Sequence, residues 1–182
     1  MLLKDTNIVL SGSNRGIGLA LLHILSENGA NIFACTRKKE KEFYQIVDDI
    51  MLKNDNIINP IHFDFEDIES TKEAAGEILR NKKKIHAIIN NAGIIQTAPF
   101  LMTKISDLNK LYEVNYSHQL VFNQILIDRL QVVIVVVRVE LRVLYVLMII
   151  LRPFMNTINF VKEEWEAVEV LTNSLLASCG PK

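Results

Sequence analysis

Residues 9–30 read VLSGSNRGIGLALLHILSENGA, and this stretch predicts a strand, a glycine-rich loop and a helix in that order. The chain before the loop is short and apolar, which is typical of a buried strand. Gly12, Gly16 and Gly18 then follow in a G-x-x-x-G-x-G spacing. Glycines allow a tight bend and leave no Cβ between the backbone amides and a bound phosphate.

The helix predicted after this loop ends at Asn28-Gly29, a typical C-terminal cap. Its first turn would present free backbone amides and the positive end of the helix dipole to an anion. A tight turn without a ligand would also fit the glycines alone. The order of strand, glycine loop and capped helix favours a phosphate-binding turn.

Composition limits the classes of function that remain open. The chain has 182 residues, a formal net charge of −1 and a sequence pI of about 6.4, so no basic surface indicates a nucleic-acid partner. Cys35 and Cys179 are far apart and show no metal-ligand spacing. Free thiols and the absence of a secretory signal pattern at the start predict a cytoplasmic protein without a metal.

Residues 131–151 read QVVIVVVRVELRVLYVLMIIL and are long enough to cross a bilayer. Arg138, Glu140 and Arg142 fall near the middle, where each would cost about 2.5–3.5 kcal/mol in a spanning helix. We therefore expect a buried strand that runs into a helix, and no membrane partner.

Strand-like and helix-like segments alternate along the chain, which predicts βαβ units and a parallel sheet. Right-handed crossovers would place the glycine loop at the carboxyl edge, where the strand order reverses. No repeat or linker marks a second domain, so residues 1–182 are predicted to form one domain. The further strands are expected at 31–36, 58–65, 85–90 and 132–137, and the further helices at 38–54, 66–81 and 105–130.

Four motifs in residues 1–130 resemble those of the short-chain dehydrogenase/reductase family. SGSNRGIG resembles the family's T-G-x-x-x-G-x-G motif, with Ser11 in place of threonine, and Asp64 stands at the end of the third strand. NNAG, residues 90–93, matches the motif after the fourth strand, and Asn115 stands at the position of the family's active-site asparagine. The resemblance implies a Rossmann-like, doubly wound α/β fold with three layers and a nicotinamide dinucleotide cofactor.

The same resemblance implies the cofactor-binding residues. The glycine loop would hold the phosphates, Arg37 a 2′-phosphate, Asp64 and Phe65 the adenine, and NNAG the ribose region. In full, the implied residues are Gly12, Ser13, Asn14, Arg15, Gly16, Ile17, Gly18, Arg37, Asp64, Phe65, Asn91, Ala92 and Gly93.

Charge at the end of the second strand favours NADP(H) over NAD(H), although the family uses both. A carboxylate there accepts from the ribose 2′-OH of NAD, whereas a 2′-phosphate needs cations. Here the strand ends in Cys35-Thr36-Arg37, and Arg15 lies inside the glycine loop. Two guanidinium groups that converge on one dianion are well suited to the 2′-phosphate.

The family's proton-donating residues are not found by spacing. The resemblance implies a serine near residues 139–142 and a tyrosine and lysine near positions 155 and 159, which are Met155 and Asn159. No tyrosine is followed by lysine at the fourth position, and Tyr145, the nearest tyrosine, has Ile149 there. Asn115 and Tyr145 are thus the remaining catalytic candidates.

Composition changes where the motifs end. Residues 131–151 contain eight valines and two arginines but no lysine, serine or glycine, whereas residues 1–130 contain 11 lysines and four arginines. One hypothesis is a frameshifted, C-terminally truncated product; the other is a divergent member that kept the fold. Residues 159–180 predict an amphipathic helix that covers a sheet edge or pairs with a second copy as a homo-oligomer.

These observations predict an oxidoreductase that transfers hydride between NADP(H) and an unknown carbonyl or alcohol. The alternative is an inactive NADP(H)-binding or regulatory protein, or a truncated product that lacks the serine and the Tyr-x-x-x-Lys pair. A structural partner without nucleotide affinity is the third class.

Overall fold

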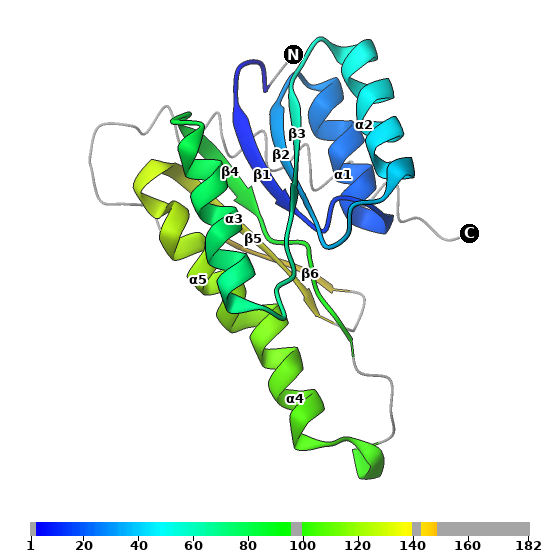
Figure 1. Ribbon diagram of the computed structural model, residues 1–182, viewed down its shortest axis with the longest axis vertical. Coiled ribbons are helices and arrows are strands. Elements are labelled where there is room, and N and C mark those ends of the chain that lie inside the picture. Colours follow the sequence, from blue (N-terminus) through cyan, green and yellow to red (C-terminus); the bar gives the residue numbers. More distant parts are fainter. Residues whose placement is uncertain (1–2, 96–99, 140–142, 149–182) are drawn as a thin grey trace.

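The computed structural model describes residues 3–95, 100–139 and 143–148, and it describes side chains over residues 3–95 and 101–130. A six-stranded sheet with the order β3-β2-β1-β4-β5-β6 forms its centre (Figure 1). The first five strands in this order are parallel, and β6 runs antiparallel to β5. The strands are β1 (Asn7–Ser11), β2 (Asn31–Thr36), β3 (Ile58–His62), β4 (Ile85–Ile89), β5 (Leu130–Val139) and β6 (Val143–Met148).

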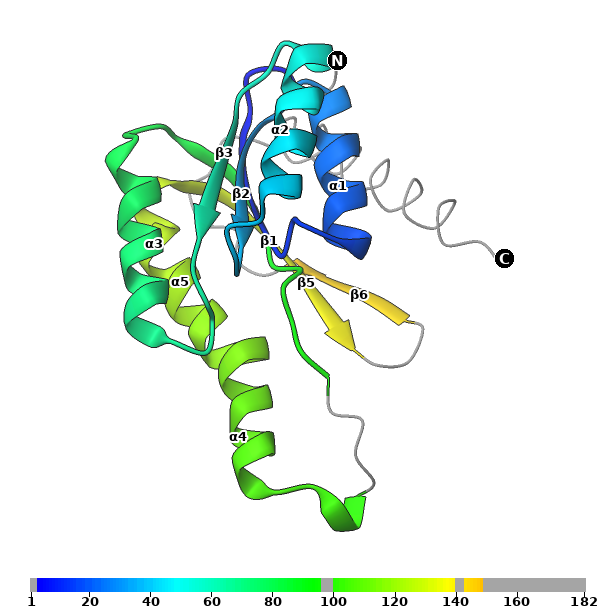
Figure 2. The ribbon, with the colours of Figure 1, turned by 45° about the vertical axis from the view of Figure 1, so that its right-hand side comes forward.

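Helices cover both faces of this sheet, as the doubly wound prediction requires. Helices α1 and α2 lie on one side and α3 and α5 on the other, while α4 projects beyond the sheet (Figure 2). The helices are α1 (Gly16–Glu27), α2 (Lys41–Asn54), α3 (Ile68–Arg80), α4 (Ile105–Tyr112) and α5 (His118–Leu126), with 3-10 turns η1 (Phe100–Met102) and η3 (Ile127–Arg129) and the π-helical segment η2 (Glu113–Ser117).

Two apolar cores result from the alternation of side chains along the central strand β1. Ile8 and Leu10 pack into the core under α1 and α2, whereas Val9 packs into the core under α3 and α5. All five residues of β1 are buried, as expected for a parallel strand that is covered on both faces. This buried strand fixes the position of the glycine loop that follows it.

The predicted boundaries agree with the structure where turn residues mark them. Strand β2 spans the predicted residues 31–36, and α1 ends at Glu27 with Asn28 as its C-cap, followed by Gly29 with φ +90°. Helix α2 begins at Lys41 rather than residue 38, and β3 ends at His62 rather than residue 65. Pro60 lies within β3, where an edge position leaves part of the backbone without ladder partners and tolerates a missing N–H.

The expected helix after the valine-rich strand is wrong over residues 143–148. These residues form β6, which pairs antiparallel with β5 from Val139 opposite Val143 to Ile134 opposite Met148. A short apolar run does not distinguish a buried strand from a buried helix, and here pairing with β5 decides the outcome. Within the described ranges, no helix combines the length and the apolar character needed to cross a membrane.

Residues 149–182 lie outside the described part of the chain. The amphipathic helix at residues 159–180 therefore remains a prediction. Nothing is described at Met155, Asn159 or Cys179 either. The single-domain assignment and the homo-oligomer also remain predictions. Helix α4 has no buried residue and exposes the large apolar side chains of Ile105, Leu108 and Tyr112.

Candidate functional site

A cleft of about 1130 Å³ opens at the carboxyl ends of β1, β2, β3 and β4. It lies where the strand order reverses, with β2 on one side of β1 and β4 on the other. Open α/β sheets bind ligands at such a reversal. All the predicted cofactor residues except Ser13 line this cleft, namely Gly12, Asn14, Arg15, Gly16, Ile17, Gly18, Arg37, Asp64, Phe65, Asn91, Ala92 and Gly93.

The glycine loop needs its glycines for two different reasons. Gly12 and Gly16 have φ values of +68° and +55°, a backbone region that side chains disfavour. At Gly18 the reason is close approach: a Cβ would lie 1.9 Å from the carbonyl oxygen of Gly12. The loop can therefore close directly against the start of α1.

The N-terminus of α1 remains open to a ligand. Arg15 is the N-cap residue, no side chain caps the helix, and its first turn contains no acidic residue. The N–H groups of a helix's first turn have no intrahelical acceptor, so they can bind an anion in the cleft. This geometry suits a pyrophosphate.

Ser11 connects this loop to the end of β4. Its hydroxyl oxygen accepts hydrogen bonds from the N–H groups of Asn91 and Ala92, each at 3.0 Å. The side-chain amide of Asn91 donates in return to the carbonyl oxygens of Ser11 and Gly12, each at 3.1 Å. The two motifs that are 80 residues apart in sequence thus form one rigid rim of the cleft.

Ser13 is fully buried and does not line the cleft. Both its N–H and its hydroxyl donate to the carbonyl oxygen of Cys35 at 3.1 Å. Ser13 therefore connects the glycine loop to the end of β2 by hydrogen bonds. Burial raises the pKa of the Cys35 thiol strongly, which keeps it protonated and unreactive.

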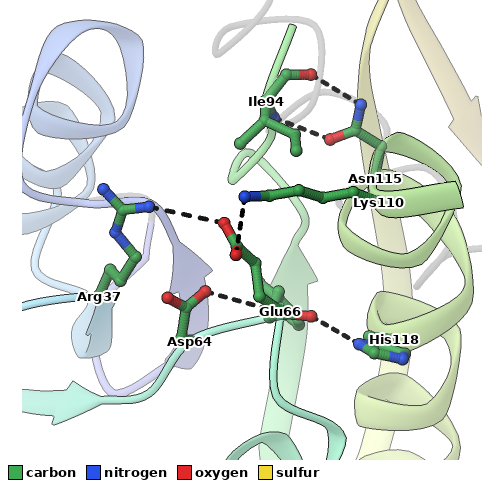
Figure 3. A network of polar contacts seen from close by, with 8 residues as sticks. Arg37, Asp64, Glu66, Ile94, Lys110, Asn115 and His118 are labelled. Carbon is green, nitrogen blue, oxygen red and sulfur yellow. Dashed lines mark hydrogen bonds and ion pairs between the residues drawn. The ribbon is translucent and has the colours of Figure 1, made fainter. Parts of the chain in front are cut away.

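The other end of the cleft holds a network of charged side chains (Figure 3). Asp64 turns the chain after β3 by accepting a hydrogen bond from the N–H of Glu66 at 3.0 Å. The carboxylate of Glu66 lies between two cations, 3.9 Å from Arg37 and 2.8 Å from Lys110. Arg15, the second predicted cation, lines the same cleft.

Two carboxylates in this cleft were missed by sequence reasoning. Glu66 follows β3, and Glu40, just before α2, accepts a hydrogen bond from Asn14 at 3.2 Å. The prediction of cofactor preference rests only on the residues at the end of β2 and on Arg15 in the glycine loop. Neither acid belongs to a motif, so no signal in the sequence indicated that these chain segments meet here.

Asn115 lies in the π-helical segment η2, between α4 and α5. Its side-chain amide donates to the carbonyl of Ile94 and accepts from the N–H of Ile94, both at 2.8 Å (Figure 3). A Cβ at Gly93 would lie 3.2 Å from the same amide oxygen. Asn115 thus fixes the chain after NNAG from within the π-helical turn.

Two further side chains, Gln119 and His118, support the wall of the cleft. Gln119, also missed by sequence reasoning, donates to the carbonyls of Ala92 at 2.7 Å and Val114 at 2.9 Å. His118 points its Nδ1 at the carbonyl of Phe65, so this nitrogen carries the proton (Figure 3). Both hold backbone that lines the cleft.

Tyr145 is placed in β6, with its backbone opposite Val137. Its side chain lies outside the described residues, so its catalytic role remains a prediction. The region where the resemblance implies a serine, residues 139–142, begins at Val139, the last residue of β5, and its other residues lie outside the described ranges.

His62 is half-buried and forms hydrogen bonds with Thr36 and Tyr44. The Thr36 hydroxyl donates to the carbonyl of Lys38 at 3.2 Å, so it accepts from Nδ1–H of His62 at 2.8 Å. The Tyr44 hydroxyl then donates to Nε2 at 2.6 Å. Burial, and next the charge of Lys39, lower the pKa of His62, so the ring is neutral at pH 7.

Comparison with known proteins identifies the family. The model of the short chain dehydrogenase family matches residues 6–137, which include the glycine loop, NNAG and Asn115. The chain belongs to the short-chain dehydrogenase family. Its membership rests on the part of the chain that builds the cleft.

Curated relatives of this dehydrogenase family match the same part. Dehydrogenase/reductase SDR family member 7B from Xenopus tropicalis is 30% identical over 118 residues, covering 63% of this chain and 38% of the relative. NADPH-dependent 3-dehydrocapnine reductase from Ornithobacterium rhinotracheale is 31% identical over 109 residues, covering 59% and 37%. The matched segment thus spans under two fifths of these relatives.

Solved structures of short-chain dehydrogenases share the fold. A Burkholderia cenocepacia short chain dehydrogenase in complex with NADP superposes with a TM-score of 0.68 at 20% identity, over 74% of this chain and 56% of the other. The NADPH-bound carbonyl reductase from chicken fatty liver superposes with a TM-score of 0.60 at 25% identity, over 70% and 49%.

Proposed function

We propose that this short-chain dehydrogenase binds NADP(H) in the cleft and catalyses hydride transfer between NADP(H) and a carbonyl or alcohol substrate. The observation that carries the proposal is the cleft itself, with the uncapped α1 N-terminus at one wall and Arg15 and Arg37 among its lining residues. The names of the reductase from O. rhinotracheale and of the chicken enzyme include NADPH, which supports the same cofactor here.

The residues fit a dinucleotide by shape as well as by charge. Space at Gly18 is so restricted that a Cβ would overlap the loop, whereas a Cβ at Gly16 would meet no atom within 4 Å, so Gly16 opens to the cleft. The first α1 turn would bind the pyrophosphate, and Asn91, Ala92 and Gly93 would line the ribose region. The cleft is large enough for a dinucleotide, since small-ligand pockets occupy about 300–1,000 Å³.

Preference for NADP(H) follows from the cations near the adenosine end. Arg37 follows β2 directly and has a half-exposed side chain, so its guanidinium can form charge-assisted hydrogen bonds to a 2′-phosphate. Asp64 and Phe65, after β3, would line the adenine. NAD(H), without the phosphate, would lose the contact with Arg37.

When bound, the nicotinamide of NADP(H) supplies or accepts the hydride. The residues around the cleft would bind and orient this group. Asn115 would hold the backbone of Ile94 at the reaction end of the cleft through its two hydrogen bonds. An orienting scaffold of this kind lowers the entropic part of the barrier.

The proton source decides between the proposed function and its alternative. No tyrosine in the sequence has a lysine at the fourth following position, and an isolated phenol has a pKa near 10, which is poorly matched to neutral pH. Loss of a general acid typically costs about 10²–10⁴ in rate. A chain that binds NADPH but consumes none with any carbonyl would therefore be a binding or regulatory protein.

The test is an affinity measurement on Arg37→Gln with NADPH and NADH. Removal of one charge-assisted contact should weaken NADPH binding about tenfold, while NADH binding changes less than about twofold. Arg80→Gln removes an exposed arginine that does not line the cleft and serves as the control. Equal losses for both nucleotides would contradict the assignment of Arg37 to the 2′-phosphate.

A further inference from the structure

Glu66 is shared by two cations at the adenosine end of the cleft. Its Oε2 lies 2.8 Å from Nζ of Lys110, and its Oε1 lies 3.9 Å from Nη1 of Arg37. Figure 3 shows the carboxylate between the two side chains, with Arg37 extending from the segment after β2 and Lys110 from α4. Arg37 and Glu66 line the cleft, whereas Lys110 reaches Glu66 from outside it.

The two distances show which cation holds the carboxylate. At 2.8 Å the Lys110 ammonium forms a charge-assisted hydrogen bond, while at 3.9 Å Arg37 is beyond hydrogen-bond distance. Lys110 therefore compensates most of the charge of Glu66. The guanidinium of Arg37 has five N–H donors and keeps them for another anion.

Without Lys110, Glu66 would act against a bound phosphate in two ways. The carboxylate would turn to Arg37, its remaining cation within 4 Å, and occupy its donors. It would also repel a phosphate dianion directly. Lys110 thus keeps the carboxylate of Glu66 away from the guanidinium of Arg37, for which it would compete with the phosphate.

We propose that Lys110 is a positioning residue for cofactor selectivity: it engages Glu66 and thereby leaves Arg37 to the 2′-phosphate of NADP(H). The inference rests on the proposed function, because it concerns how the same cleft distinguishes a 2′-phosphate from a 2′-hydroxyl. The proposed role concerns the 2′-phosphate alone. NADH and 5′-AMP carry no 2′-phosphate, so their affinities should not change when Glu66 pairs with Arg37.

The size of the effect is set by solvent. The three side chains are 35–53% exposed, so their interactions are screened. Exposed ion pairs of this kind change an equilibrium by about two- to fivefold, and less at high ionic strength. We expect Lys110→Met to weaken binding of 2′,5′-ADP and NADPH about three- to fivefold at low salt.

The experiment titrates the full chain with 2′,5′-ADP, 5′-AMP, NADPH and NADH at low and at high salt. Lys110→Met should lower affinity for the two 2′-phosphorylated compounds alone, and Lys110→Arg should restore it. Glu66→Gln should raise that affinity slightly, and the double variant Lys110→Met/Glu66→Gln should return to the wild-type value, a non-additive result that indicates direct coupling.

A matched control removes an equally short ion pair elsewhere. Lys72 lies 2.7 Å from Glu69 on α3, outside the cleft, and Lys72→Met should change none of the four affinities. A structural effect of Lys110→Met would weaken all four compounds together, and that result would overturn the inference. Additive effects of the two substitutions would overturn it as well.

Failure of the proposed function gives a different result. If the wild-type chain binds 2′,5′-ADP no better than 5′-AMP, the cleft does not recognise the 2′-phosphate, and both proposals are wrong. If the wild-type chain prefers 2′,5′-ADP but Lys110→Met keeps the same preference, only the role of Lys110 is wrong.

Discussion

The side-chain amide of Asn115 pairs with both backbone groups of Ile94, donating to its carbonyl and accepting from its N–H, each at 2.8 Å. The pair joins the π-helical segment η2 to the chain that leaves β4. It determines the position of the cleft wall at Ile94. Its loss should therefore affect both stability and the shape of the site.

Asn115→Ala should lower the free energy of unfolding by about 1–3 kcal/mol, because the substitution leaves both backbone groups of Ile94 without partners. Urea unfolding measures this change. Asn109→Ala on α4, where the side chain is exposed, is the control and should stay within about 0.5 kcal/mol of the wild type. Equal stability of the two variants would show that the Ile94 pairing contributes nothing.

Gly18→Ala should abolish nucleotide binding, since its Cβ would lie 1.9 Å from the carbonyl oxygen of Gly12 and force the loop apart. Gly76→Ala is the matched control, because Gly76 lies inside α3 and the nearest atom to its Cβ would be 4.0 Å away. That control should stabilise the protein by about 0.5–1 kcal/mol through helix propensity. Unchanged NADPH affinity in Gly18→Ala would disprove the close approach.

Ser11→Ala should destabilise the protein by about 1–3 kcal/mol, because the N–H groups of Asn91 and Ala92 lose their shared acceptor. Ser11→Thr keeps the hydroxyl and should retain most of the stability. Thermal unfolding of both variants, read beside NADPH affinity, measures the effect. Ser11 does not hold the rim together if the alanine and threonine variants unfold at the same temperature.

Stability should fall as the pH drops below about 6.5. Burial lowers the pKa of His62 in the folded state, so the unfolded chain binds its proton more readily and acid favours unfolding. His86 has a pKa lowered by burial and by Lys84, and it contributes with the same sign. Urea unfolding above and below this pH should show a smaller decrease for His62→Gln than for the wild type; an identical decrease would remove His62 as a cause.

The sequence predicted most reliably those features that local chemistry determines. The bounds of β2, the capped end of α1 and the left-handed Gly12 and Gly16 follow from apolar runs and turn residues. The cofactor residues expected from the motifs line the cleft, except Ser13, which bonds to Cys35 inside the protein.

Features that depend on tertiary packing could not be predicted in the same way. Glu66 and Lys110 are 44 positions apart and meet only because the fold brings α4 beside the segment that follows β3. Strand β6 was expected as part of a helix, since its apolar run has no readable period and only pairing with β5 determines its conformation.

The most direct test of the central claim is a calorimetric titration of the full chain with NADPH and with NADH, followed by NADPH consumption with a panel of carbonyl compounds. We predict binding of NADPH about tenfold or more tighter than NADH, because the proposed function assigns Arg37 to the 2′-phosphate. Equal affinity for the two nucleotides, or no binding of either, would contradict this claim.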